Sequence, residues 1–208
     1  MSSLFHSLKS WNTHAYLDVN QWAVHSSFIH WFMTPFAYWL GIVFFVILLV
    51  IGWWNARSAN DPVRAVAKVV WAAGGAVVAL GLGQLVNHAA AERRPYYVLH
   101  HVEVLVPRVH DFAFPSDHAT MAGAVTVGLW LASKRLGIIS LIVGLALCFA
   151  RVYVGAHYPG DVIAGFLLGA SVVGLFAVLM VPVLAVLGSV AARTPLRPLL
   201  VAPERDGL

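Results

Sequence analysis

Long apolar stretches separated by short polar segments are the main pattern along this chain. The clearest stretch, Pro35–Trp54, has twenty residues without a charge, which is the length of a helix that crosses a hydrocarbon layer about 30 Å thick. Four further stretches are similar, and we expect each to form a membrane-spanning helix. They are Val69–Val86, Ser116–Ser133, Leu136–Val154 and a span within Val162–Ala192, which Pro182 is expected to kink or end.

The N-terminal segment, residues 1–34, has a different pattern. Between Trp11 and Met33, polar residues are mixed with aromatic ones; the polar ones are Asp18, Asn20, Gln21, His25 and His30. This mixture is typical of an amphipathic helix that lies in the membrane interface. A true sixth span is the alternative.

Composition strengthens the membrane interpretation. Hydrophobic residues make up 60% of the 208 residues and charged residues 11%, whereas soluble domains have about 25% charged residues. The mean hydropathy is +0.80. We therefore predict an all-α protein, a polytopic membrane helix bundle with five or six transmembrane helices in a single domain, residues 1–208. The formal net charge of +4 is spread along the chain, which argues against nucleic-acid binding because no basic patch is formed.

The basic residues are distributed unequally between the two sides of such a bundle. Eight of the thirteen fall on the side that also holds the tail, residues 193–208: Arg57, Arg64, Lys68, Lys134, Arg135, Arg193, Arg197 and Arg205. The positive-inside rule makes that side cytoplasmic. The 87–115 and 155–161 connections then share the extracytoplasmic face of what we expect to be a bacterial plasma membrane, whether or not the N-terminal segment crosses.

The 155–161 connection carries a histidine and a carboxylate four residues apart, His157 and Asp161, at the entrance to the last span. Pro159 suits the first turn of a helix, so the Asp161 carboxylate can face His157. A carboxylate that accepts from one ring nitrogen fixes the tautomer and leaves the other nitrogen free to attack phosphorus. A helix-capping pair without catalytic function is the alternative.

Arginines accompany this pair. Arg151 lies at the outer end of the preceding span, where an unpaired guanidinium is costly, and its planar fork suits a phosphate. A structural ion pair with Asp161 is the alternative. Arg93 and Arg94 in the 87–115 connection follow the same logic, although one of them can instead pair with Glu92 or with lipid headgroups.

The tetrapeptide Pro115-Ser116-Asp117-His118 indicates a helix N-terminus with Ser116 as the cap. The free amides and the dipole of such a terminus attract anions. His118, in the first turn, is placed to protonate a leaving-group oxygen. Taken alone, the tetrapeptide is a capping signal and no more.

Further histidines crowd the same connection and raise the question of a metal. They are His88, His100, His101 and His110. Their spacing does not correspond to a structural or catalytic zinc pattern. We therefore predict neither a metal nor another cofactor.

Taken together, these segments resemble the type 2 phosphatidic acid phosphatase family. Its three motifs are Lys-x6-Arg-Pro, Pro-Ser-Gly-His and Ser-Arg-x5-His-x3-Asp. This chain has Asn87-x6-Arg94-Pro95, the tetrapeptide 115–118, and Ala150-Arg151-x5-His157-x3-Asp161. The order and the internal spacing agree. The Asp at position 117 and the small size resemble the bacterial undecaprenyl-pyrophosphate phosphatases of this family in particular.

The resemblance implies a role for each site residue. His157 is the nucleophile that forms a phosphohistidine, Asp161 orients it, and His118 is the general acid. Residues expected to contact the substrate phosphates are Arg94, Arg151, Ser116, Asp117, Arg93 and Asn87. Three positions depart from the family pattern: Asn87 replaces a lysine, Asp117 a glycine and Ala150 a serine.

The predicted function is therefore hydrolysis of a membrane lipid diphosphate, most closely undecaprenyl diphosphate, to the monophosphate and phosphate on the extracytoplasmic face. Its partners are the lipid phosphate substrate and the bilayer. Alternatives within the same chemistry are a phosphatase for phosphatidate, phosphatidylglycerol phosphate or a prenyl-linked sugar phosphate. An inactive lipid-binding scaffold and a transporter are alternatives of other classes, although the charge-free span interiors disfavour transport.

Overall fold

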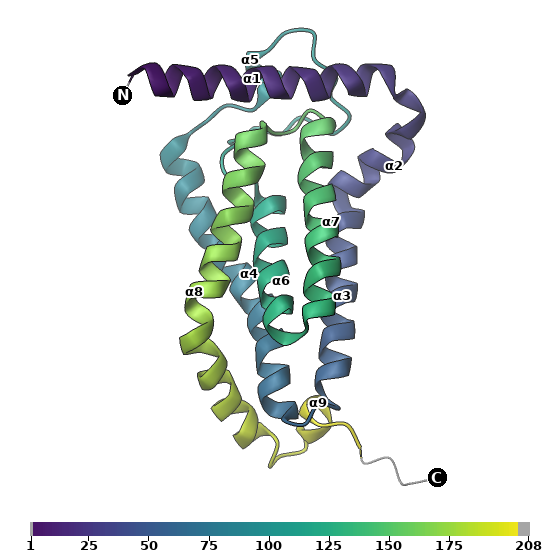
Figure 1. The fold of residues 1–208 in the computed structure, drawn as a ribbon, viewed down its shortest axis with the longest axis vertical. Helices are drawn as coiled ribbons and strands as arrows, with labels where there is room; N and C mark the ends of the chain where they lie inside the picture. Colours follow the sequence, from purple (N-terminus) through teal and green to yellow (C-terminus); the bar gives the residue numbers. More distant parts are fainter. Residues whose placement is uncertain (1, 204–208) are drawn as a thin grey trace.

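The computed structural model describes residues 2–203, and over this range the chain is helical with no strand. Five long helices run side by side (Figure 1). They are α3 (Gly41–Ala56), α4 (Pro62–Ala90), α6 (Asp117–Ala132), α7 (Lys134–Tyr153) and α8 (Pro159–Ala191). Each coincides with one of the five stretches predicted from the sequence, so the predicted all-α bundle is confirmed.

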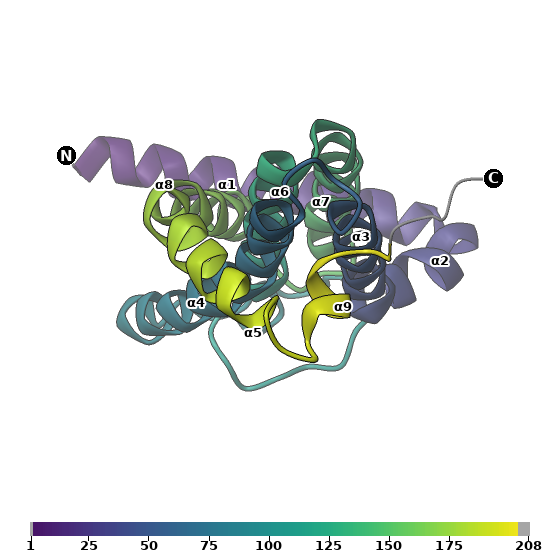
Figure 2. The same ribbon diagram turned by 90° about the horizontal axis from the view of Figure 1, so that it is seen from below.

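Four helical stretches are long and apolar enough to cross a membrane: Ser27–Ala56, Pro62–Val98, Lys134–Tyr153 and Pro159–Ala191. The remaining long helix, α6, has 16 residues, which makes it about 24 Å long at 1.5 Å per residue. It packs against α4, α7 and α8 in the interior of the bundle (Figure 2). α8 continues through Pro182 to Ala191, so the proline does not end this helix. The chain is thus a multi-pass membrane protein.

Close contact between α6 and α8 brings the N-termini of these two helices to the same end of the bundle. A Cβ atom at Gly169 would collide with the carbonyl oxygen of Thr120, so only glycine permits this backbone approach. Ala119, Ala122 and Ala124 on α6 are completely buried. The motif residues at the starts of the two helices are therefore neighbours.

The first helix, α1 (Ser2–His25), lies across one end of the bundle instead of along it (Figure 1). Trp11 and Trp22 are exposed, whereas Tyr16 and Asn20 are buried against the bundle. α1 therefore does not run alongside the five long helices as a sixth member of the bundle, and its location in the membrane interface stays a prediction. The first membrane-crossing stretch begins at Ser27, before the predicted start at Pro35, because short helical elements join it to α3. These are η1 (Ser27–Ile29), α2 (His30–Pro35) and η2 (Phe36–Leu40).

We call the end of the bundle that carries α1 and residues 91–116 and 154–158 the loop end. It includes the short helix α5 (Pro95–Val98). The opposite end, which we call the basic end, carries residues 57–61, Ser133 and the segment after Ala191 with α9 (Arg197–Leu200). The basic residues predicted to share one side lie at or near the basic end, except Arg205, which is outside the described residues.

Candidate active site

A cavity of about 180 Å³ opens at the loop end. Five of the nine predicted site residues line it: Arg94, Asp117, His118, Arg151 and His157. They come from three separate parts of the chain: the loop after α4, the start of α6, and the last turn of α7 with the loop that follows it. The fold therefore gathers into one site the residues that the sequence motifs singled out.

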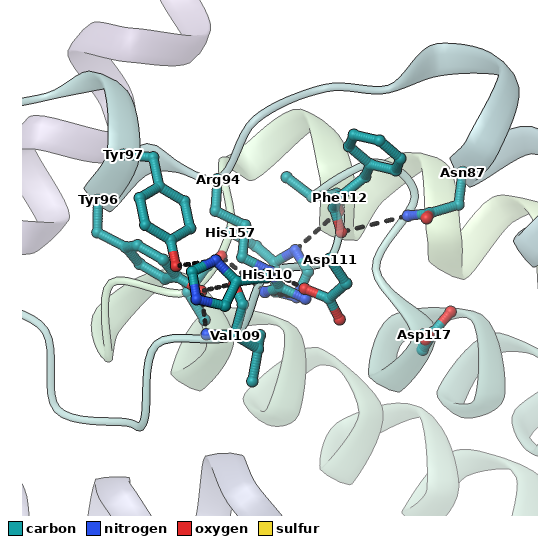
Figure 3. A network of polar contacts seen from close by, with 12 residues as sticks. Asn87, Arg94, Tyr96, Tyr97, Val109, His110, Asp111, Phe112, Asp117 and His157 are labelled. Atoms are coloured by element: carbon teal, nitrogen blue, oxygen red, sulfur yellow. Dashed lines mark hydrogen bonds and ion pairs between the residues drawn. The ribbon is translucent and has the colours of Figure 1, made fainter.

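His157 lies in the loop between α7 and α8 and is 2% exposed. Its Nδ1 is 2.9 Å from the carbonyl oxygen of Ala113, and its Nε2 is 3.1 Å from Nη1 of Arg94. A carbonyl can only accept and a guanidinium can only donate, so Nδ1 carries the proton and the unprotonated Nε2 accepts from Arg94. His157 and Arg94 lie next to each other in Figure 3.

Asp161 is completely buried behind His157. Its Oδ2 accepts from the backbone N–H of Tyr158 at 2.8 Å and is 3.5 Å from Nδ1 of His157. The carboxylate therefore closes the first turn of α8 and lies near the ring, but the Ala113 carbonyl is the closer acceptor. The sequence indicated the Asp161 carboxylate as a partner of His157 but gave no sign of the Ala113 carbonyl.

Burial and two neighbouring arginines keep His157 neutral. Desolvation first, then the positive charges of Arg151 and Arg94, lower the pKa of His157 well below its ordinary value. A lowered pKa means that the ring stays unprotonated at neutral and mildly acidic pH. The Nε2 lone pair is therefore available for attack across that range.

The two buried arginines present guanidinium groups to the cavity. Arg94 donates from Nε to Asp111 at 2.6 Å and from Nη1 to the Ala156 carbonyl at 3.1 Å. Arg151 donates from Nη1 to the Ala37 carbonyl at 3.1 Å, and its buried Nε has no partner. The ion pair between Arg151 and Asp161, an alternative from the sequence, does not form between these two described side chains.

The start of α6 supplies the other polar wall of the cavity. Oδ1 of Asp117 accepts from Nε2 of Gln84 at 2.9 Å, which turns the carboxylate toward α4. The ring of His118 lies at the cavity with Nε2 3.3 Å from the Tyr38 carbonyl. A histidine facing a buried histidine across a cavity of this size is suited to proton transfer to a bound group.

Three of the predicted phosphate-binding residues do not line the cavity. Ser116 is completely buried, its hydroxyl does not cap α6, and its Oγ has no partner. Arg93 is exposed and faces a neighbouring depression that includes Tyr97. Asn87 is buried and its amide donates to backbone carbonyls. The structure therefore does not bring these three side chains to the cavity, because each is directed to protein atoms or to a different surface.

The loop that carries His157 is fixed from several sides. Gly155 has φ +80°, and a Cβ there would collide with the Glu103 carbonyl, so the turn before His157 needs glycine. From α1, Tyr16 donates to the Gly155 carbonyl at 3.3 Å, and Asn12 accepts from the Gly160 amide at 2.7 Å. Helix α1 therefore helps to hold the loop that carries His157.

The additional histidines of the loop end do not converge. His110 stacks on Tyr97, and His88 bonds to the Gln84 carbonyl within its own helix. Within residues 2–203, no three His, Cys, Asp or Glu side chains come close enough together to hold a metal ion.

The fold is a bundle of membrane-spanning helices, and at one end it buries a histidine beside two arginines. These features are those of an integral membrane protein with a site suited to binding phosphate. The sequence pattern of the PAP2 superfamily matches residues 68–184, more than half of the chain. The chain belongs to the PAP2 superfamily, as the motifs indicated.

Two sequence relatives and one solved structure are similar to this chain. Undecaprenyl-diphosphatase BcrC of Bacillus subtilis is 32% identical over 143 residues, 69% of this chain and 68% of that protein. A Sulfolobus acidocaldarius protein named undecaprenyl-diphosphatase is 38% identical over 95 residues, 45% of this chain and only 46% of that protein. The crystal structure of Aquifex aeolicus LpxE superposes with a TM-score of 0.59 over 79% of this chain and 93% of that chain, at 25% identity.

Proposed function

We propose that this protein is a metal-independent lipid diphosphate phosphatase that converts a polyprenyl diphosphate such as undecaprenyl diphosphate to the monophosphate and inorganic phosphate. The observation that carries the proposal is the buried His157 ring, whose Nδ1 is bonded to a carbonyl while Nε2 faces Arg94 at the cavity. The names of the two relatives support a diphosphate of a polyprenol as the substrate class. In this proposal residues 1–208 act as one domain.

In the first step, Nε2 of His157 attacks the terminal phosphorus, and the bond from that phosphorus to the bridging oxygen breaks. His118, in its protonated form, gives its proton to the departing lipid monophosphate. Arg94 and Arg151 bind the oxygens of the transferring group. Binding of the phosphate replaces the contact between Arg94 and Nε2, so the lone pair becomes free when the substrate is in place.

The phosphohistidine intermediate has a phosphoryl group on Nε2 and a proton on Nδ1, so its ring is positively charged. The Ala113 carbonyl at 2.9 Å and the Asp161 carboxylate at 3.5 Å both stabilise that charge. In the second step, His118, now neutral, takes a proton from water, and the resulting nucleophile attacks phosphorus. Inorganic phosphate leaves, and both histidines return to their starting states.

The test is phosphate release by the purified protein in the presence of a chelator. We expect undecaprenyl diphosphate to be hydrolysed faster than phosphatidate or phosphatidylglycerol phosphate, with no loss of rate on chelation. A preference for one of the other lipids would reassign the substrate and keep the chemistry. Complete inactivity towards all three lipids would favour the lipid-binding scaffold.

The orientation belongs to the same proposal: the cavity faces the outside of a bacterial plasma membrane, because the basic residues gather at the opposite end. In a Cys148→Ser background, we expect a cysteine at exposed His100 to react with an impermeant thiol reagent on intact spheroplasts. A cysteine at exposed Ser58 should react only after the membrane is permeabilised. The reverse labelling pattern would place the cavity in the cytoplasm.

A further inference from the structure

The side chain of Asn87 does not point to the cavity, as its place in the motif suggested, but to the backbone of a neighbouring loop. It lies near the end of α4, is 6% exposed, and does not line the cavity. Both of its hydrogen bonds run from Nδ2, one to the Phe112 carbonyl at 3.2 Å and one to the Phe114 carbonyl at 3.1 Å. The side chain thus bonds the residues immediately before and after Ala113, and Figure 3 shows Asn87 beside Phe112.

Ala113 is the residue whose carbonyl accepts from Nδ1 of His157. Its own N–H donates to the Glu92 carbonyl at 2.8 Å, and the residue is completely buried. The Ala113 peptide is therefore held by the backbone at Glu92 and by Asn87 on both flanks. One amide group can make both flanking bonds because its two N–H donors lie in one plane.

We propose that Asn87 is a positioning residue for the nucleophile: it fixes the 112–114 backbone so that the Ala113 carbonyl holds the His157 ring in the reactive orientation. This inference rests on the proposed function and adds a residue that acts through the backbone and does not touch the substrate. It also explains how asparagine can occupy a position where a longer cationic side chain would be expected to reach a phosphate.

The effect on catalysis follows from the chain of contacts. Without the amide donors, two partly buried carbonyls lose their partners, and the Ala113 peptide keeps the bond to Glu92 but loses the restraint on both of its flanks. The ring of His157 then loses its fixed acceptor, and displacements of about 1 Å at a reacting group cost about 100-fold in rate. Substrate binding through Arg94 and Arg151 is not directly affected.

The primary variant is Asn87→Leu, which keeps the shape of the side chain and removes its donors. We expect kcat to fall by about 10- to 100-fold while KM stays within about threefold, because the loss is in orientation rather than in phosphate binding. Thr126→Val is the matched control: it removes one partner of the buried bond between Thr126 and Ser140, 3.0 Å long, inside the bundle. It should lower Tm without changing kcat of the folded protein.

A second variant, Asn87→Asp, covers the case in which the leucine variant does not fold. A protonated carboxyl group can donate to one of the two carbonyls, whereas a carboxylate cannot. The ratio of its kcat to that of the wild type should therefore rise as the pH falls. Because the ratio is taken at each pH, the titrations of His157 and His118 that both proteins share do not enter. A ratio that is independent of pH would contradict the proposal.

A measurement that needs no turnover separates this inference from the proposed function. In protein labelled with ¹⁵N-histidine, the His157 resonances are those missing from His157→Gln. Its Nδ1–H proton should lie downfield in the wild type, because it is hydrogen bonded to Ala113, and should move upfield in Asn87→Leu. An unchanged resonance, or a kcat equal to that of Thr126→Val, would overturn the role of Asn87. Inactivity of the wild type with a shifted resonance would refute only the proposed reaction.

Discussion

Replacing His157 with alanine is expected to reduce phosphate release by at least about 10⁴-fold; removing the nucleophile of a serine protease, which also forms a covalent intermediate, costs about 10⁶-fold. Without the imidazole there is no covalent route, and water must attack a charged diphosphate directly. Arg94 and Arg151 remain, so KM should change much less than kcat. The measurement is steady-state phosphate release from undecaprenyl diphosphate by protein of verified fold.

His157→Gln serves as the companion variant, because glutamine fills a similar volume and can donate to the Ala113 carbonyl. It should be as inactive as the alanine variant but closer to the wild type in Tm. Asp161→Asn should lose less activity, since the Ala113 carbonyl stays in place as the acceptor of Nδ1. A loss under tenfold in a folded His157 variant would remove this residue from the role of nucleophile.

The spans could be predicted from the sequence because a membrane imposes a single requirement, a charge-free helix of sufficient length. Pro62–Ala90 extends beyond its predicted range, Val69–Val86, because the helix continues into the polar interface where hydropathy no longer identifies it, whereas the start of the last helix at Pro159 agrees with the sequence. The mixed polar and aromatic residues of α1 also distinguished it from the spans, and it lies across the end of the bundle. The π-helical turn at Phe36–Leu40, which carries the helical path on past Pro35, has no comparable signal.

The candidate site was predictable where a side chain carries the chemistry and not where the backbone does. Spacing identified His118, Arg151 and His157, all of which line the cavity. The acceptor for Nδ1 is a main-chain carbonyl at Ala113, a group that every residue possesses, so no residue type announces it. Asp111, which pairs with Arg94, is one charged residue within a long loop and belongs to no motif.

Asn87 and Ser116 show a further limit of motif reasoning. Both occupy their expected sequence positions, yet both side chains point into protein instead of into the cavity. Spacing fixes where a Cα atom lies, but the reach of the side chain and the available partners decide where its polar atoms lie. At position 87 a short amide finds two carbonyls within reach.

His118 is the residue for which the two half-reactions give different expectations. In the proposed mechanism, it protonates the departing lipid phosphate and then, as its conjugate base, activates the water that hydrolyses the phosphohistidine. An aryl phosphate with an acidic phenol as leaving group needs little protonation in the first step. His118→Ala should therefore still form the phosphoenzyme from such a substrate, while turnover stops at hydrolysis.

Rapid quenching should detect this difference as a burst of phenol close to one equivalent of enzyme, followed by a slow phase. With the lipid diphosphate, the same variant should show neither burst nor turnover, since the first step needs the acid. His157→Gln is the control and should give no burst with either substrate, because it has no nitrogen to phosphorylate. If His118→Ala instead turns over both substrates at wild-type rates, His118 is only a residue of the helix start, where its ring contacts the Tyr38 carbonyl, and another group supplies the proton.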